Sequence, residues 1–295
     1  MRYDSDLLYR PPGEWKSYLL QCTIGCSNNQ CTFCGMYKEK KFRIRPTEEI
    51  LEDIDMALTY YGPGLRRVFL MDGDAIIIPT AELMKILRKL YDCFPALEKV
   101  TVYAGPRSTL AKSPEELREL HQAGLSRAYL GVESGSDQVL SFIRKGVNAQ
   151  QMLEAGQRLV EAGIDLWTTV ILGLTGARGE GGDWREHILA TADISNKMKP
   201  RHLSAMTFAP AKGTPLGEDV LAGRFQVCSP EHILEECRLL IEHLDVNPLH
   251  FTSNHASNYL PLKGSLPEDR EKFLSLIDQA LEGKIRLRKT LNRGI

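Results

Sequence analysis

The sequence predicts an α/β fold built on a parallel sheet, and three observations lead to this class. Six short apolar runs alternate with stretches of helical periodicity. Parallel strands require helical crossovers, so this alternation is typical of a parallel sheet. Four segments of unusual polar or glycine content follow four different strands, at the ends where α/β proteins bind ligands. An open doubly wound sheet and a barrel both satisfy these observations.

Local start and stop signals set the elements of the first half. Ser113, Pro114 and Glu116 provide an N-cap, a first-turn proline and the glutamate of a capping box, and Gly124 ends that helix. Thr47 is expected to cap an earlier helix. The expected strands are 17–21, 67–71, 99–104 and 127–132, and the expected helices are 47–61, 80–91 and 114–123.

The second half continues the alternation as far as about Thr214. Strands are expected at 166–172 and 202–208, with helices at 150–162, 184–198, 230–244 and 268–281. A polar segment, 247–267, is expected to be a loop. No hydrophobic-poor linker separates the last region. The expected organisation is an N-terminal segment (1–16), a barrel (17–215) and a helical C-terminal extension packed on it (216–295).

Composition indicates an ordinary globular protein. Of the 295 residues, 43% are hydrophobic and 25% are charged, which is enough for a sizeable core without disulfides. The net charge of −1 argues against a protein whose main task is to bind a nucleic-acid backbone. The polar N-terminus and the lack of 18 consecutive apolar residues predict no secretory signal, no membrane helix and a cytoplasmic location.

The most informative motif is Cys26-Ser-Asn-Asn-Gln-Cys31-Thr-Phe33-Cys34, which holds three of the seven cysteines. Thiolates at this spacing form a site for a soft metal. A structural zinc site with Cys22 as fourth ligand is one interpretation, although such sites usually consist of two separated C-x-x-C pairs. A 4Fe–4S cluster held by three thiolates is the other, and it leaves one iron open to a ligand.

The segment GCSNNQCTFCGMY resembles the cluster loop of the radical S-adenosylmethionine (SAM) superfamily, with one residue more than the commonest C-x-x-x-C-x-x-C spacing. The resemblance covers roughly 17–215 and implies a partial (β/α)6 barrel of the TIM type. It implies that Cys26, Cys31 and Cys34 bind the cluster. Cys22 is the alternative first ligand, and Phe33 is expected to pack near the adenine of SAM.

Two segments that follow strands resemble the parts of the superfamily that bind the methionine end of SAM. Gly73-Asp74 is similar to the Gly-Gly-Glu segment that binds the SAM ammonium, although such a pair is also an ordinary turn. GVESGSDQVLSFIRKG resembles the fourth-strand segment of oxygen-independent coproporphyrinogen oxidase, the methylthiotransferases and the elongator-type acetyltransferase. There Glu133 or Ser134 would approach the ribose hydroxyls or the methionine end.

The basic pair after that segment and the fifth strand complete the expected SAM contacts. Arg144 or Lys145 would pair with the SAM carboxylate, although a solvated basic pair would look the same. TTVILGLTG resembles the adenine segment, with backbone contacts as far as Gly173, and 206–209 is a weaker match to the same site. A buried strand would show the same pattern.

The resemblance implies an oxidoreductase that cleaves SAM at the cluster and uses the 5′-deoxyadenosyl radical to abstract hydrogen from a small or medium-sized organic substrate. A reductant such as flavodoxin or ferredoxin is the expected protein partner, and nucleic acid is not expected. The alternatives are a radical SAM enzyme that modifies RNA and a non-enzymatic zinc or iron–sulfur module. No RNA-binding module is recognisable, which counts against the first.

Several remaining features have two interpretations. The polar segment 247–267 either lines the substrate pocket or satisfies its own backbone. Cys93, Cys228 and Cys237 are expected to be buried or incidental thiols. The basic runs 38–45 and 284–293 are expected to be solvated faces rather than nucleic-acid contacts.

Overall fold

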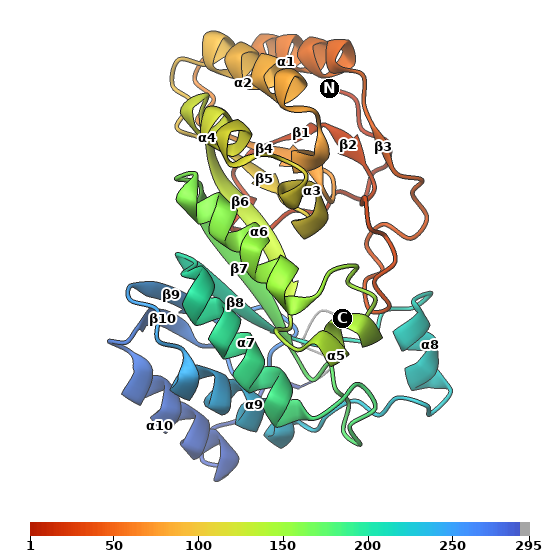
Figure 1. Ribbon diagram of the computed structural model, residues 1–295, viewed down its shortest axis with the longest axis vertical. Coiled ribbons are helices and arrows are strands. Elements are labelled where there is room, and N and C mark those ends of the chain that lie inside the picture. Colours follow the sequence, from red (N-terminus) through yellow and green to blue (C-terminus); the bar gives the residue numbers. More distant parts are fainter. Residues whose placement is uncertain (290–295) are drawn as a thin grey trace. The chain divides into compact units, whose positions relative to one another are not determined.

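The computed structural model describes residues 1–289, which divide into two compact units (Figure 1). The first unit comprises 1–29, 36–130 and 158–166, and the second comprises 30–35, 131–157 and 167 onward. Strands β6 (Leu125–Glu133) and β7 (Asp165–Leu172) and helix α6 (Ala149–Glu161) contribute residues to both. The end of the basic run 284–293 lies outside the described residues.

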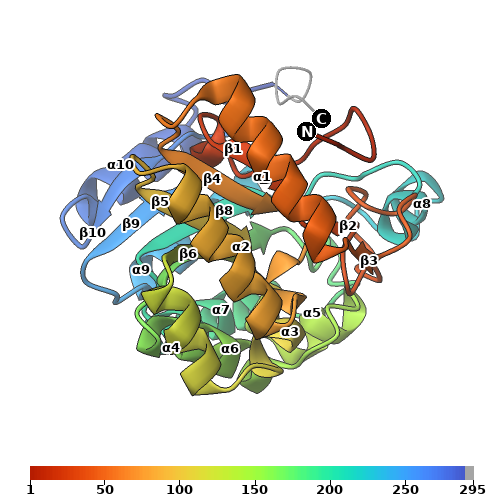
Figure 2. The ribbon, with the colours of Figure 1, turned by 90° about the horizontal axis from the view of Figure 1, so that it is seen from above.

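The first unit is built on parallel strands in the order β1-β4-β5-β6. Helices α1 (Thr47–Tyr61) and α2 (Thr80–Cys93) pack side by side (Figure 2). The other strands are β1 (Tyr18–Gln21), β4 (Arg67–Met71) and β5 (Lys99–Tyr103), and β2 (Thr23–Ile24) pairs antiparallel with β3 (Arg43–Ile44). Its remaining helices are α3 (Pro106–Leu110) and α4 (Pro114–Gln122), with 3-10 turns at Pro12–Glu14 and Ala75–Ile77.

The second unit has the strand order β7-β8-β9-β10, in which β10 alone runs antiparallel to its neighbour. Its strands after β7 are β8 (His202–Thr207), β9 (Leu249–Thr252) and β10 (Lys263–Leu266). Its helices after α6 are α7 (Trp184–Met198), α8 (Pro215–Leu221), α9 (Pro230–His243) and α10 (Arg270–Leu281), and α5 (Asp137–Phe142) precedes them. Helix α9 packs against both α7 and α10 (Figure 1).

The expected strands and helices form, with boundaries within two residues of those expected. The strand expected at 67–71 and the helix expected at 184–198 have those limits. The capping box forms, since Ser113 Oγ accepts from Glu116 N–H at 3.1 Å and the Glu116 carboxylate accepts from Ser113 N–H at 2.8 Å. Thr47 is not an N-cap, because Pro46 takes the extended cap conformation and Thr47 is already helical.

The segment 247–267, expected to be a loop, contains two strands. β9 pairs in parallel with β8, and β10 pairs with β9. Leu249 and Phe251 are fully buried whereas His250 is partly exposed, which is the alternation of a half-buried strand. Strands of four residues are too short for this alternation to stand out among polar neighbours.

No helix among the described residues is long and apolar enough to cross a membrane.

Candidate cofactor site

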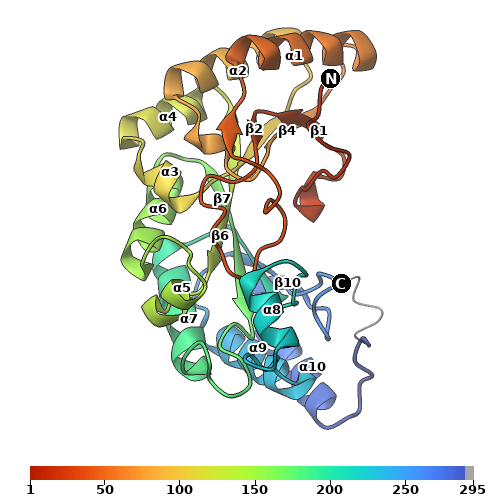
Figure 3. The same ribbon diagram turned by 90° about the vertical axis from the view of Figure 1, so that its right-hand side faces the viewer.

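The three clustered cysteines lie in a long connection without regular structure. Residues 25–42 join β2 to β3 and form no helix or strand (Figure 3). Cys26, Cys31 and Cys34 are half-buried and form no disulfide. Cys26 belongs to the first unit, and the other two belong to the second. Their thiol groups are therefore partly accessible and are not used in disulfides.

Cys22 lies in a different environment from these three. Its side chain is fully buried, and its Sγ donates to the Leu20 carbonyl at 3.4 Å. Burial raises the pKa of this thiol far above its ordinary value. A metal ligand must be a thiolate, so this environment opposes metal binding. Its features count against the alternative in which Cys22 is the first ligand.

In the first unit, Gly73 lies directly against Cys26. A Cβ added to Gly73 would stand 2.9 Å from Cys26 Cβ and 2.6 Å from Tyr37 Cε2, so only glycine fits. The Gly73 N–H donates to the Gly25 carbonyl at 3.1 Å. The structure thus brings together the first cysteine and a glycine that the sequence predicts to face SAM.

Asp74, predicted to bind the SAM ammonium, is fully buried and accepts hydrogen bonds from its own unit. Gly105 N–H donates to Oδ1 at 2.7 Å, and Ser108 Oγ donates to Oδ2 at 2.5 Å. The hydroxyl of Ser27, the residue after Cys26, donates to the same Oδ2. Asp74 therefore fixes the start of the cysteine loop, while its contact with SAM stays a prediction.

Asp72 stands in the same turn as Gly73 and Asp74, and the sequence analysis gave it no role of its own. It is fully buried, and its Oδ2 accepts from Lys40 Nζ at 3.0 Å and from Gly25 N–H at 3.2 Å. Burial lowers the pKa of Lys40, but hydrogen bonds to Asp4 and Asp72 outweigh burial and raise it overall. The signal available in the sequence was the carboxylate directly after a buried strand.

In the second unit, two backbone hydrogen bonds hold Thr32, which follows Cys31. Thr32 N–H donates to the Ile143 carbonyl at 2.9 Å, and Leu216 N–H donates to the Thr32 carbonyl at 2.9 Å. Phe33 packs on an apolar cluster formed by Val139, Leu140, Ile143, Ile171, Leu174, Phe208, Leu216 and Phe225. Ile171 and Phe208, two members of this cluster, come from the two segments predicted to meet adenine.

Glu133 and Lys145 are brought together as an ion pair. Lys145 Nζ lies 2.8 Å from Glu133 Oε1, and both side chains are nearly buried. Glu133 has φ 64° and Arg144 has φ 54°, a left-handed conformation that costs energy for residues other than glycine. Arg144 lines a surface depression of about 440 Å³. The predicted SAM contacts of these residues remain untested.

Ser134 and His187 form a chain of hydrogen bonds. The sequence analysis did not single out His187. His187 Nε2 lies 3.1 Å from the Ile171 carbonyl and Nδ1 lies 2.8 Å from Ser134 Oγ. A carbonyl only accepts, so Nε2 carries the proton. Burial lowers the pKa of His187, so the ring is neutral and Nδ1 accepts from Ser134. The same Oγ accepts from Ser136 N–H at 2.9 Å.

His187 makes a testable contribution to the pH dependence of stability. Its folded pKa lies below the unfolded value of about 6.5, so below that pH the unfolded chain binds the extra proton. Stability from this group is complete above about pH 6.5 and is lost as the pH falls, with a slope approaching about 1.4 kcal/mol per pH unit. His187→Gln is expected to remove this slope in urea unfolding between pH 7 and 5. Equal slopes in the two proteins would contradict the assignment.

Gly173 has φ 79°, and its N–H donates to Glu236 Oε2 at 2.7 Å. A Cβ there would lie 2.8 Å from Ile233 Cδ1, so glycine allows helix α9 to approach the end of β7. Glu236 is fully buried and was not recognised in the sequence. A glutamate between apolar helical positions, as in Leu234-Glu235-Glu236-Cys237, was the available signal.

The described residues fit a thiolate-bound cluster with a polar ligand. Half-buried thiols are suitable iron ligands. The buried hydroxyls of Ser136 and Thr175, next to the predicted SAM segments, lack hydrogen-bond partners among the described residues. Such groups cost about 1–3 kcal/mol unless water or a ligand satisfies them.

The radical SAM superfamily model matches residues 20–192, more than half of the chain. An uncharacterized methyltransferase of Pyrococcus horikoshii is 24% identical over 204 residues, covering 67% of this chain and 40% of the relative. The tRNA-2-methylthio-N(6)-dimethylallyladenosine synthase of Aquifex aeolicus is 26% identical over 230 residues, covering 73% and 49%. The chain spans less than half the length of these relatives.

The structure of methylornithine synthase is similar, with a TM-score of 0.52 and 17% identity, over 92% of this chain and 83% of that one. This likeness shows the fold, and it confirms the predicted α/β barrel class. The family match, together with the three-cysteine loop, identifies the chain: it belongs to the radical SAM superfamily, whose enzymes use a 4Fe–4S cluster and SAM.

Proposed function

We propose that Cys26, Cys31 and Cys34 bind the 4Fe–4S cluster, and that the enzyme abstracts hydrogen from a small or medium-sized organic substrate. The observation that carries this proposal is the three-cysteine loop within the matched family region. When bound, the cluster and SAM supply a 5′-deoxyadenosyl radical by one-electron cleavage of the sulfonium. The electron comes from a reductant such as flavodoxin or ferredoxin in the cytoplasm.

The residues around the cysteines position the loop that would hold the cluster. Asp74 fixes Ser27 beside the first cysteine through a hydrogen bond. Thr32 is fixed on both sides by backbone hydrogen bonds. Phe33 turns its ring into the apolar cluster of the second unit and so excludes water there. These contacts order the loop before any ligand binds, which lowers the entropy cost of binding.

The proposed contacts with SAM are of two kinds: those made by charged side chains and those made by backbone groups. Arg144 or Lys145 would pair with the SAM carboxylate, and Lys145 would do so at the expense of its present bond to Glu133. Glu133 is then released to accept from ribose hydroxyls. Gly73, which lies beside Cys26, and Gly173, at the end of β7, would contribute backbone contacts to SAM.

Modification of RNA is the second candidate function. It is favoured by the 26% identity to a tRNA methylthio-synthase. The net charge of −1 counts against it, because binding to an RNA backbone usually requires excess positive charge.

One anaerobic experiment tests these functions. The chain is reconstituted with iron and sulfide, reduced with dithionite and supplied with SAM, and 5′-deoxyadenosine is expected as a product. Absence of iron and acid-labile sulfide, with zinc bound by three or four sulfurs instead, would overturn the assignment. A tRNA mobility shift at low salt separates the candidates, since tight binding supports RNA modification and no shift supports a small substrate.

A further inference from the structure

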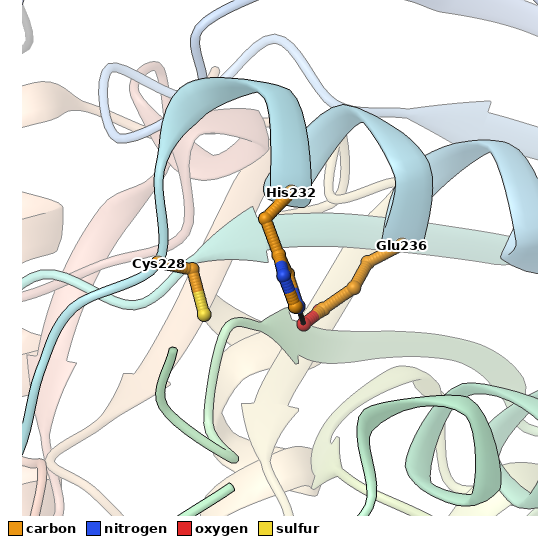
Figure 4. Close-up of side chains that lie close together, drawn as sticks. All are labelled: Cys228, His232 and Glu236. Atoms are coloured by element: carbon orange, nitrogen blue, oxygen red, sulfur yellow. Dashed lines mark hydrogen bonds and ion pairs between the residues drawn. The ribbon is translucent and has the colours of Figure 1, made fainter. Parts of the chain in front are cut away.

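Three potential metal ligands meet outside the cysteine loop, at the start of helix α9. The thiol of Cys228, a ring nitrogen of His232 and a carboxylate oxygen of Glu236 all lie within 4.8 Å of one another. Figure 4 shows the three side chains converging from α9 and from the residues just before it. The sequence analysis expected Cys228 to be a buried or incidental thiol. It is buried, and the structure adds that two further potential ligands lie beside it.

The start of the helix explains how residues eight apart can meet. In a continuous helix they would be about 12 Å apart along the axis. Cys228 instead precedes the N-cap, Ser229, whose side chain accepts from His232 N–H at 3.2 Å. The chain is therefore not helical at Cys228, and its thiol can turn toward the next two turns. His232 and Glu236, at a spacing of four, share one helix face.

The carboxylate and the imidazole are both held in place by other groups. Glu236 Oε1 lies 3.2 Å from His232 Nε2, and Oε2 accepts from Gly173 N–H at 2.7 Å. The His232 ring lies 5.1 Å from the Trp184 ring, centroid to centroid. Cys228 and Glu236 are buried, and His232 is partly buried. Backbone donors that orient a ligating carboxylate are a common feature around protein metal ions.

We propose that Cys228, His232 and Glu236 form a second metal site, which binds Zn²⁺. Sulfur, imidazole nitrogen and carboxylate oxygen are the ligand set of zinc, whereas Mg²⁺ and Ca²⁺ prefer oxygen alone. Zinc bonds of about 2.0–2.3 Å require ligand atoms that lie within 4.8 Å of one another to come closer, which small side-chain rotations would allow. Three protein ligands leave the fourth position to water.

The zinc site acts on the end of β7. The carboxylate that binds zinc also holds the Gly173 N–H, and a Cβ on Gly173 would lie 3.8 Å from Cys228 Sγ. Zinc draws the start of α9 toward Gly173 and fixes both. Zinc also supplies a cation beside the buried Glu236 side chain, where an ionised carboxylate is costly without one.

Zinc K-edge X-ray absorption of the reconstituted, cluster-loaded chain tests the site, because this edge does not report iron. After equilibration with ZnCl₂ and removal of excess metal, we expect one zinc per chain with a single sulfur neighbour near about 2.3 Å. Three or four sulfur neighbours would place the zinc on other cysteines and overturn the proposal. Less than a tenth of a zinc per chain would overturn it as well.

Variants identify the ligands through competition with a zinc-chelating dye. Cys228→Ser and His232→Gln are expected to weaken zinc binding by about tenfold or more. Cys93→Ser, a half-buried cysteine on α2, is the matched control and is expected to bind zinc as the unchanged chain does. Unchanged affinity in both ligand variants would contradict the site. His232→Gln alters a partly exposed side chain, so it decides the question if Cys228→Ser fails to fold. Formation of 5′-deoxyadenosine is not used as a readout, so failure here is distinct from failure of the proposed function.

Discussion

Cys26→Ala is expected to abolish both the 4Fe–4S cluster and 5′-deoxyadenosine formation. Two thiolates cannot hold a cluster whose fourth iron is already open to a ligand, because a second iron then loses its protein ligand. Iron and acid-labile sulfide per chain, measured after anaerobic reconstitution, should fall to background. The residue lies in the connection between β2 and β3 and is half-buried, so the change leaves the fold intact.

Cys22→Ala is the matched control for that variant, since it also removes a thiol near the loop. Cys22 is a fully buried thiol bonded to the Leu20 carbonyl. We expect the cluster to be retained, with a modest loss of stability from the smaller core side chain. The opposite pair of outcomes would make Cys22 the first ligand and Cys26 a bystander.

Asp74→Ala is expected to destabilise the chain by about 3 kcal/mol, because it removes a buried carboxylate that accepts three hydrogen bonds, each contributing roughly 1 kcal/mol or more. Gly105 N–H and the hydroxyls of Ser27 and Ser108 lose their acceptor. Urea unfolding of the metal-free chain measures the effect. Ser27 adjoins Cys26, so cluster retention should also fall.

Asp55→Ala is the control for that measurement. Asp55 is exposed on α1 and pairs with Lys89 at 2.6 Å, a surface contact that contributes less than about 1 kcal/mol. Unchanged stability of Asp74→Ala, combined with weaker SAM binding, would show that Asp74 serves the SAM ammonium rather than the loop.

Local signals predicted the element boundaries of this chain well. The capping box at Ser113 is complete within four residues, and the period of α7 is repeated over fifteen. Strands β9 and β10 escaped prediction because four polar-rich residues carry little periodicity. Strand β9 pairs with β8, which lies more than forty residues earlier in the chain, and β10 pairs with β9.

In the candidate site, too, features set by near neighbours were predictable and contacts between distant residues were not. Cys26, Cys31 and Cys34 were recognisable because three thiols within nine residues are a strong chemical signal. The partner of Ser134 was not, since His187 lies 53 positions away and looks like any helical histidine. The grouping of Cys228 with His232 was not recognisable, although the two are four residues apart. Cys228 precedes helix α9, so the helical periodicity that relates His232 to Glu236 does not include it.

The sequence by itself indicated the class of cofactor and the alternation of the strands and helices as far as β8. Both follow from side-chain chemistry and hydrogen bonds between near neighbours, which a linear pattern contains. Only the tertiary structure decided that Asp74 holds the start of the cysteine loop and that Glu236 joins Gly173 to a second group of metal ligands. These contacts form between groups dozens of residues apart, and they exist only once packing has brought the backbone of one element against the side chains of another.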